Sequence, residues 1–181
     1  MTHAAKRLQG SSHLLSGTAQ LNRVGRIGFP VHQLTCDGEV IASLGRAGWI
    51  RIFLGRGQRV ELADGSRWRI KSIGLHGKIS PAIFDDQGRK IALSSLGTNA
   101  YGVNGRDFGF ELYQLDKRGV SRANRWILRR HDVGVADLTR HPRSIRSHEP
   151  IHVGATLLAF TLVRFGILGE FTPRLKLQWS R

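Results

Sequence analysis

The sequence is poor in cysteine and in acidic residues. Its 181 residues include one cysteine, Cys36, and 13 Asp and Glu against 28 Lys and Arg, which gives a formal charge of +15. A single cysteine excludes an internal disulfide and a zinc site built from several thiolates. The composition also excludes collagen-like, Gln/Asn-rich and acidic-tail proteins. With 40% apolar and 23% charged residues, the chain is instead expected to fold around a hydrophobic core.

The first residues contain no apolar run of signal-peptide length. Leu14 and Leu15 form an isolated apolar pair in a polar stretch. We therefore expect residues 1–23 to be a flexible polar lead-in and residues 24–181 to form a single domain. The lack of an export signal and the lone Cys36 favour a cytoplasmic protein, either unattached or peripheral to a membrane.

Alternating apolar and polar residues predict β-strands over most of the chain from Val24 to Leu128. Four units each have two alternating runs joined by a turn with Asp and Gly, which is typical of β-hairpins. Within each unit the apolar residues before and after the turn are all even-numbered or all odd-numbered, as Cys36 and Val40 are. Because cross-strand partners must point to the same face of the sheet, each turn is expected to have three residues. The four turns lie at 37–38, 64–65, 86–88 and 116–119, and further runs lie at 27–31, 50–54 and 174–179.

The segment from Arg130 to His148 interrupts this pattern, because it is polar, basic and contains Pro142. We expect it to be a connection over the surface with a short helix around Val133 to Arg140. Among the tryptophans, Trp68, Trp126 and Trp179 share the parity of core positions, and Trp49 is the candidate for an exposed aromatic residue.

A hydrophobic helix is predicted at about 150–168. Ser147 can cap its start, Pro150 suits a first turn, and Gly166 and Gly169 can end it. Its apolar residues surround the helix on nearly every side, so it must be buried in a bilayer or in a protein core.

Two environments could bury this helix. The apolar stretch from Ile151 to Phe165 is interrupted by His152 and Arg164 and is shorter than the roughly twenty residues of a membrane span. A single-span membrane protein is therefore the less favoured alternative. A closed barrel covers a central helix on all sides, whereas one sheet face does not. We predict a mainly β fold, a closed antiparallel barrel of about 11–12 strands around one hydrophobic C-terminal helix.

Short strands with Asp-Gly turns, a basic connection and a late hydrophobic helix together resemble the tubby C-terminal-like superfamily. This group includes phospholipid scramblases and the LURP-one-related proteins of plants. The resemblance implies a closed barrel of about twelve strands around a C-terminal hydrophobic helix, over about residues 24–181. It rests on the layout of the elements, and no site residue is carried over from the family.

The positive charge predicts a polyanionic partner. It is densest between Lys117 and Arg146, where acidic residues are few. The candidate binding residues there are Arg122, Arg125, Arg129, Arg130, Arg140, Arg143 and Arg146. With the family resemblance, this region favours a non-enzymatic module that binds anionic phospholipid or phosphoinositide-like headgroups. The alternatives are a nucleic-acid-binding β-barrel and a structural or assembly component, and the charge does not select an oligomeric state.

No residue pattern supports catalysis, a cofactor or a metal site. His131-Asp132 stands without the further ligands of a metal-dependent hydrolase, and the eight histidines show no ligand spacing. Asp85-Asp86 lies at a hairpin turn, where Asp is favoured for backbone reasons. Cys36 has the parity of a buried residue rather than of a nucleophile.

Overall fold

The computed structural model describes residues 13–25, 31–45, 57–75, 78–96, 101–105, 113–117, 125–131, 133–139 and 143–164. Within these ranges the mainly β class with one helix, as predicted from the sequence, is confirmed. The helix is α3 (Val153–Arg164). The strands are β1 (Leu14–Val24), β2 (Val31–Cys36), β3 (Glu39–Leu44), β4 (Gln58–Leu62), β5 (Arg67–Leu75), β6 (Lys78–Asp85), β7 (Lys90–Leu96), β8 (Tyr101–Gly105), β9 (Tyr113–Lys117), β10 (Arg125–Arg130), β11 (Val133–Thr139) and β12 (Ser144–His152).

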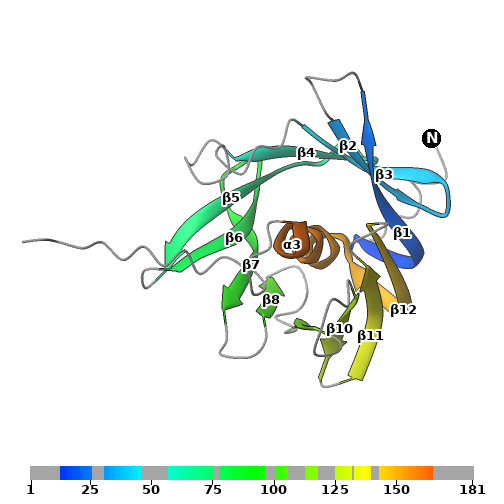
Figure 1. Ribbon diagram of the computed structural model, residues 1–181. Coiled ribbons are helices and arrows are strands. Elements are labelled where there is room, and N and C mark those ends of the chain that lie inside the picture. Colours follow the sequence, from blue (N-terminus) through cyan, green and yellow to red (C-terminus); the bar gives the residue numbers. More distant parts are fainter. Residues whose placement is uncertain are drawn as a thin grey trace, which may run out of the picture.

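Neighbouring strands in the sequence pair with each other in antiparallel fashion. The pairings run from β2 with β3 through to β11 with β12. β1 pairs with β2 along one edge and with β12 along the other, so it joins the first and last parts of the sheet. Figure 1 shows the strands arranged around α3.

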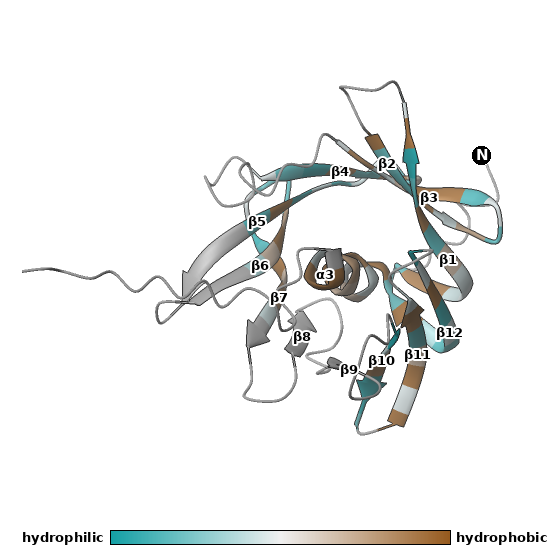
Figure 2. Cartoon of the chain, viewed as in Figure 1, coloured by the Kyte–Doolittle hydropathy of each residue, from teal (hydrophilic) through white to brown (hydrophobic). Residues whose placement is uncertain are grey.

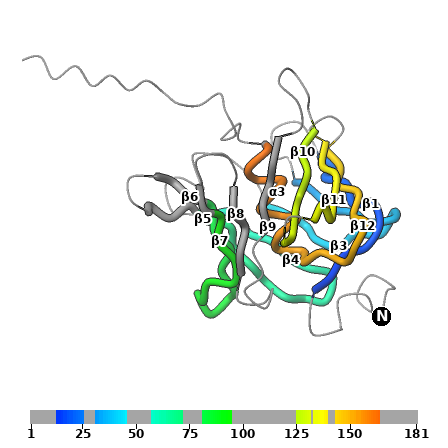
Figure 3. Tube along the Cα trace, turned by 90° about the horizontal axis from the view of Figure 1, so that it is seen from below, coloured from blue at the N-terminus to red at the C-terminus, as the bar shows by residue number. Residues whose placement is uncertain are grey.

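The helix α3 lies on the inner side of the strands. It contacts β1, β6, β7, β8 and β12. Figure 3, turned by 90° from Figure 1, shows β7 on one side of α3 and β1, β11 and β12 on the other. Residues 153–163 are all buried, and Figure 2 shows the helix as predominantly hydrophobic among strands of mixed hydropathy. Two buried hydroxyls bond back along the chain, from Thr156 to the His152 carbonyl and from Thr161 to the Leu157 carbonyl.

Two of the predicted three-residue turns are confirmed. The Leu62 N–H donates to the Ser66 carbonyl across residues 63–65, and the Asp85 N–H donates to the Arg89 carbonyl across residues 86–88. In each turn the third residue is a glycine with positive φ, which fits a three-residue loop ending in the left-handed conformation.

The predicted three-residue turn is wrong for the first hairpin. Cys36 pairs with Glu39, and the two residues between them both have positive φ: Asp37 at 50° and Gly38 at 85°. A two-residue turn of this kind twists with the strands. A shift of register at Leu34 and Thr35 then changes the parity, so Val40 is 40% exposed while its successor Ile41 is buried.

The N-terminal lead-in predicted at 1–23 is contradicted from residue 14 onward, because β1 begins there. Leu15, Ala19 and Leu21 are buried, and the polar residues between them face outward. The alternation was obscured by Gly17, which has a φ of 100° and lies at a bulge. The partner strand β12 is distant in the sequence, so no local hairpin pattern marked the strand.

The surface connection and short helix predicted between Arg130 and His148 are also wrong. β11 and most of β12 occupy this segment, with Val135, Leu138 and Ile145 buried. The register of β10 against β11 shifts at Val135, so the neighbours Val135 and Ala136 are both buried, and this together with the charged outward residues concealed the alternation. Ser147 and Pro150 lie in β12, so the helix starts at residue 153 and not at 150.

The core positions predicted from parity agree with the structure in most strands. Trp68 and Trp126 are buried, as are Leu34, Cys36, Val60 and Leu62. The predicted strands at 27–31, apart from residue 31, at 50–54 and at 174–179, the predicted end of the helix at 165–168, and Trp49 and Trp179 lie outside the described residues.

Candidate anion-binding surface

The structure places part of the predicted cationic cluster on β10, β11 and β12. Thr139 pairs with Arg125 on one side and with Ser144 on the other, which brings Arg125 and Arg143 to the same end of the three strands. Arg125 is exposed and Arg143 is half-buried. Arg122 and Arg140 lie outside the described residues.

Carboxylates accompany the arginines on this face. Arg130 Nη2 donates to Glu149 Oε2, and Arg146 is directly opposite Asp137 on β11. Asp137 also bonds His148, with 2.9 Å between Oδ2 and Nε2. Arg129 is opposite Gly134, just past the register shift between β10 and β11, and is half-buried. The positive charge of this face is therefore offset in part by its own acidic residues.

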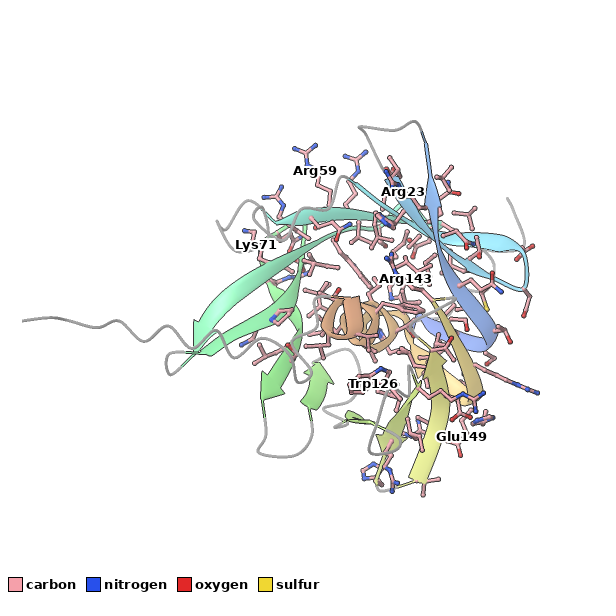
Figure 4. The ribbon with its side chains drawn as sticks, in the orientation of Figure 1. Arg23, Arg59, Lys71, Trp126, Arg143 and Glu149 are labelled. Carbon is pink, nitrogen blue, oxygen red and sulfur yellow. The ribbon has the colours of Figure 1, made fainter. Side chains whose placement is uncertain are left out.

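A second cationic surface lies on the outward side of β4 and β5, and sequence reasoning missed it. It consists of Arg59, Arg67, Arg69 and Lys71, which we call the β4–β5 cationic face. In Figure 4 Arg59 and Lys71 lie on the opposite side of α3 from Trp126 and Glu149. The signal was present in the sequence, because these odd-numbered residues alternate with the even-numbered core residues of both strands.

Like charges meet on the β4–β5 cationic face. Arg59 is directly opposite Arg69, and Arg67 is opposite Glu61. Among the residues that the structure describes, no carboxylate lies within ion-pair distance of Arg59, Arg67 or Arg69. Directly opposed like charges destabilise an antiparallel pair, so Arg59 and Arg69 repel each other across the two strands.

A hollow of about 780 Å³ lies over this face. It extends from β2 to β6, and its lining combines the four cations with Phe84, Glu61, Asp85 and Asp86. Asp85 is already engaged, because its Oδ2 accepts from Arg89 Nε at 2.7 Å and its Oδ1 accepts from the Arg89 N–H at 2.8 Å. Burial by itself raises the pKa of Asp85, but the hydrogen bonds from Arg89 outweigh it and hold the pKa below its usual range.

A cluster of polar rings joins the start of β1 to the start of α3. His13 Nε2 lies 2.9 Å from Asp64 Oδ2, and the His13 carbonyl accepts from the Val153 N–H at 2.8 Å. The His152 ring stacks on Trp68 with 6.1 Å between centroids and an angle of 8°. These contacts connect β1, the β4–β5 turn, β5 and β12, so the cluster stabilises the packing of these elements against one another.

The ionisation of this cluster follows from its burial. Burial, and then the charge of His13, lower the pKa of His152 to about 3. The neutral ring is also required by the backbone, because His152 Nδ1 accepts from the Gly154 N–H at 3.0 Å. For Asp64, burial raises the pKa, but hydrogen bonds from Ser66 and His13 outweigh it and lower the pKa overall.

The residues considered for catalysis and metal binding are dispersed. His131 is exposed at the β10–β11 turn, and Asp132 lies outside the described residues. Cys36 is buried, and its Sγ donates to the Ser16 carbonyl at 3.3 Å. Within the described ranges, no group of three or more His, Cys, Asp or Glu side chains is placed to hold a metal ion.

The helix α3 has 12 residues, and in the part of the chain that the structure describes no helix is both long and apolar enough to cross a bilayer. No protein-family model, no curated protein and no solved structure matches this chain, so the comparisons neither support nor refute the resemblance to the tubby C-terminal-like superfamily.

Proposed function

We propose that the chain is a non-enzymatic module that binds anionic lipid headgroups at the face of a membrane. In this proposal the strands form a closed antiparallel barrel around α3, the arrangement of the tubby C-terminal-like superfamily. Two features support this: β1 pairs along both of its edges, and strands from both ends of the chain contact the helix. Such a barrel has no exposed strand edge and leaves its outer face available for ligands.

The observation that carries the proposal is the opposition of Arg59 and Arg69 on the β4–β5 cationic face. A folded protein that keeps two arginines side by side gains stability when an anion binds between them. The formal charge of +15 adds a long-range attraction to any anionic surface. On the β10–β12 face, by contrast, Arg130 is paired with Glu149 and Arg146 faces Asp137.

Vesicle flotation tests this function. The whole chain is mixed with phosphatidylcholine vesicles that contain or lack phosphatidylserine, at low and at high salt. We expect recovery with the anionic vesicles only, and a loss of that recovery at high salt, because exposed charges are screened. Equal recovery with neutral and anionic vesicles at low salt would rule the function out.

Nucleic acid is the principal alternative polyanion. Single-stranded nucleic acid is usually held by exposed aromatic side chains between cations. Among the side chains that the structure describes, Trp68 and Trp126 are buried, and Phe84, which lines the hollow with Trp68, is half-buried. We therefore favour the lipid. Binding to an oligonucleotide with a steep salt dependence, together with none to anionic vesicles, would reverse this preference.

A further inference from the structure

We infer that the hollow over β4 and β5 is a binding site for one phosphate monoester, held between Arg59 and Arg69. The inference rests on the proposed function and deepens it, because it assigns the anion a chemical class and a place. The phosphate monoester can be the headgroup of a membrane lipid or a small soluble molecule, and the two share the same dianionic group.

The register of β4 and β5 brings the two guanidinium groups to one position. Arg59 and Arg69 are Cα partners on antiparallel strands, so their side chains leave the same face of the sheet within about 5 Å of each other at Cβ. Both are exposed. Each guanidinium presents a planar fork of N–H donors that matches the oxygens of a phosphate. Two forks from adjacent strands can therefore hold one phosphate group.

The charge of the hollow selects a dianion. Its lining holds four cations and three carboxylates, and Asp85 is already bonded to Arg89. Glu61 and Asp86 remain, which leaves an excess of two positive charges. A phosphate monoester carries close to two negative charges at neutral pH, whereas a carboxylate or a phosphodiester carries one. The monoester is thus the group whose charge matches the hollow.

Gly57 holds the side-chain stems in place. A Cβ at this position would lie 2.8 Å from the Cγ atoms of both Arg69 and Lys71, so the two stems pack directly against the glycine backbone. Lys71 Nζ also lies 5.5 Å from the centre of the Phe84 ring. Side chains that are ordered before binding lose less entropy when they bind. The stems of Arg69 and Lys71 therefore have packing partners before any ligand binds.

The experiment compares phosphatidic acid, which has a monoester headgroup, with phosphatidylserine in vesicles of equal surface charge. We expect the whole chain to bind phosphatidic acid vesicles about tenfold more tightly, as for the gain of a charge-assisted hydrogen bond. The double variant Arg59→Gln/Arg69→Gln should lose this preference. The matched control is Arg125→Gln/Arg146→Gln, which removes the same charge from the other face and should keep it.

A soluble arm identifies the source of the monoester. Release of the protein from the vesicles by glycerol phosphate, but not by acetate of equal ionic strength, shows that the free monoester binds. Release by neither, with the preference for phosphatidic acid intact, shows that the ligand is the lipid. Both results support the site, and unfolding curves confirm that each variant is folded.

Two failures are distinguishable. If the wild-type chain floats with neither kind of anionic vesicle, the proposed function is wrong, and the phosphate monoester site that rests on it is refuted as well. If the chain floats equally with both anionic lipids, and the two double variants weaken binding to the same extent, attachment by charge stands but the monoester site is refuted.

Discussion

At the scale of the residue, the contacts that hold β1, β5 and α3 together depend on a neutral histidine. His152 is buried at the last position of β12, and its Nδ1 accepts the Gly154 N–H. Protonation would remove this acceptor and would place a charge beside His13 in a region without bulk water. Protonation of this ring in acid therefore destabilises the fold.

We expect stability to fall in mild acid because of His152. Its pKa is about 3 in the folded chain and 6.5 in the unfolded chain, so the unfolded chain binds more protons below pH 6.5. The contribution is complete above pH 6.5 and declines as the pH falls from 6.5 toward 3, by about 2 kcal/mol at pH 5. Urea unfolding at several pH values measures it. His152→Gln should flatten the decline, and an unchanged slope in this variant would contradict the assignment.

Among the glycines that the structure describes with their surroundings, Gly57 is the one at which an added methyl group should cost most. Its φ is 66°, and a Cβ would collide with Arg69 and Lys71 at 2.8 Å. Gly57→Ala should destabilise the fold by about 2–4 kcal/mol, through backbone strain and steric overlap together. Gly65→Ala is the control, since Gly65 has a φ of 87° and open space around it, and should cost about 1–2 kcal/mol. Equal losses in the two variants would show that the stems do not rest on Gly57.

At the scale of the element, the outward faces of the strand pairs differ in how their charges are arranged. On β4 and β5, an arginine faces an arginine, whereas on β11 and β12, Asp137 faces Arg146. Cross-strand pairs contribute favourably or unfavourably according to their signs. The two faces therefore respond in opposite ways to loss of one positive charge.

Without any ligand, Arg59→Gln should stabilise the fold by about 0.2–1 kcal/mol, because it removes a like-charge contact with Arg69. Arg146→Gln should destabilise the fold by a similar amount, because it removes the partner of Asp137. Both changes should shrink at high salt, since these side chains are exposed. Denaturation curves at low and high salt measure the two shifts. If both variants change the free energy of unfolding in the same direction, cross-strand charge pairs do not determine these effects.

At the scale of the whole molecule, β1 is the strand that connects the first and last parts of the sheet. It pairs with β2 over residues 19–24 and with β12 over residues 14–20. Ser147 on β12 also donates to the Gly17 carbonyl at 3.0 Å, across 130 residues of sequence. Much of the long-range order of the fold therefore depends on a segment near the start of the chain.

We expect removal of residues 1–24 to abolish cooperative folding. The deletion leaves both β2 and β12 with an unpaired edge and opens the core beside Leu15 and Leu21. Circular dichroism and sizing chromatography should show loss of the unfolding transition and aggregation. The substitution Asn22→Ser, at an exposed position of the same strand, is the control and should retain a normal transition. A folded monomer after the deletion would show that β1 is dispensable.

The predictable parts of this fold are those set by neighbours in the sequence. The hairpins around residues 37–38, 64–65 and 86–88 follow from Asp and Gly between alternating runs, and the helix follows from apolar residues on every side. The length of the first turn was mispredicted, because the bulge in β2 and β3 that corrects the parity leaves no mark in the composition. The strands β1, β11 and β12 were missed because bulges and charged outward residues hide their alternation.

The candidate site was predictable in kind but not in place. The excess of arginine predicts an anionic partner, and that excess is visible in the sequence. The densest run of arginine, at β10 to β12, is where folding also brings Glu149 and Asp137 beside the cations. The sparser cations at Arg59 and Arg69 meet each other instead, because the register of β4 and β5 makes them partners.

The sequence by itself determined the class of the fold, the apolar helix and the positive sign of the net charge, because alternation, apolar content and net charge are properties of local segments and of totals. Only the tertiary structure decided which strands lie beside β1, which arginines are offset by carboxylates, and which arginines are opposed to each other. These contacts depend on strand register. Register brings together residues that are far apart in the sequence, and no local sequence pattern indicates that they are in contact.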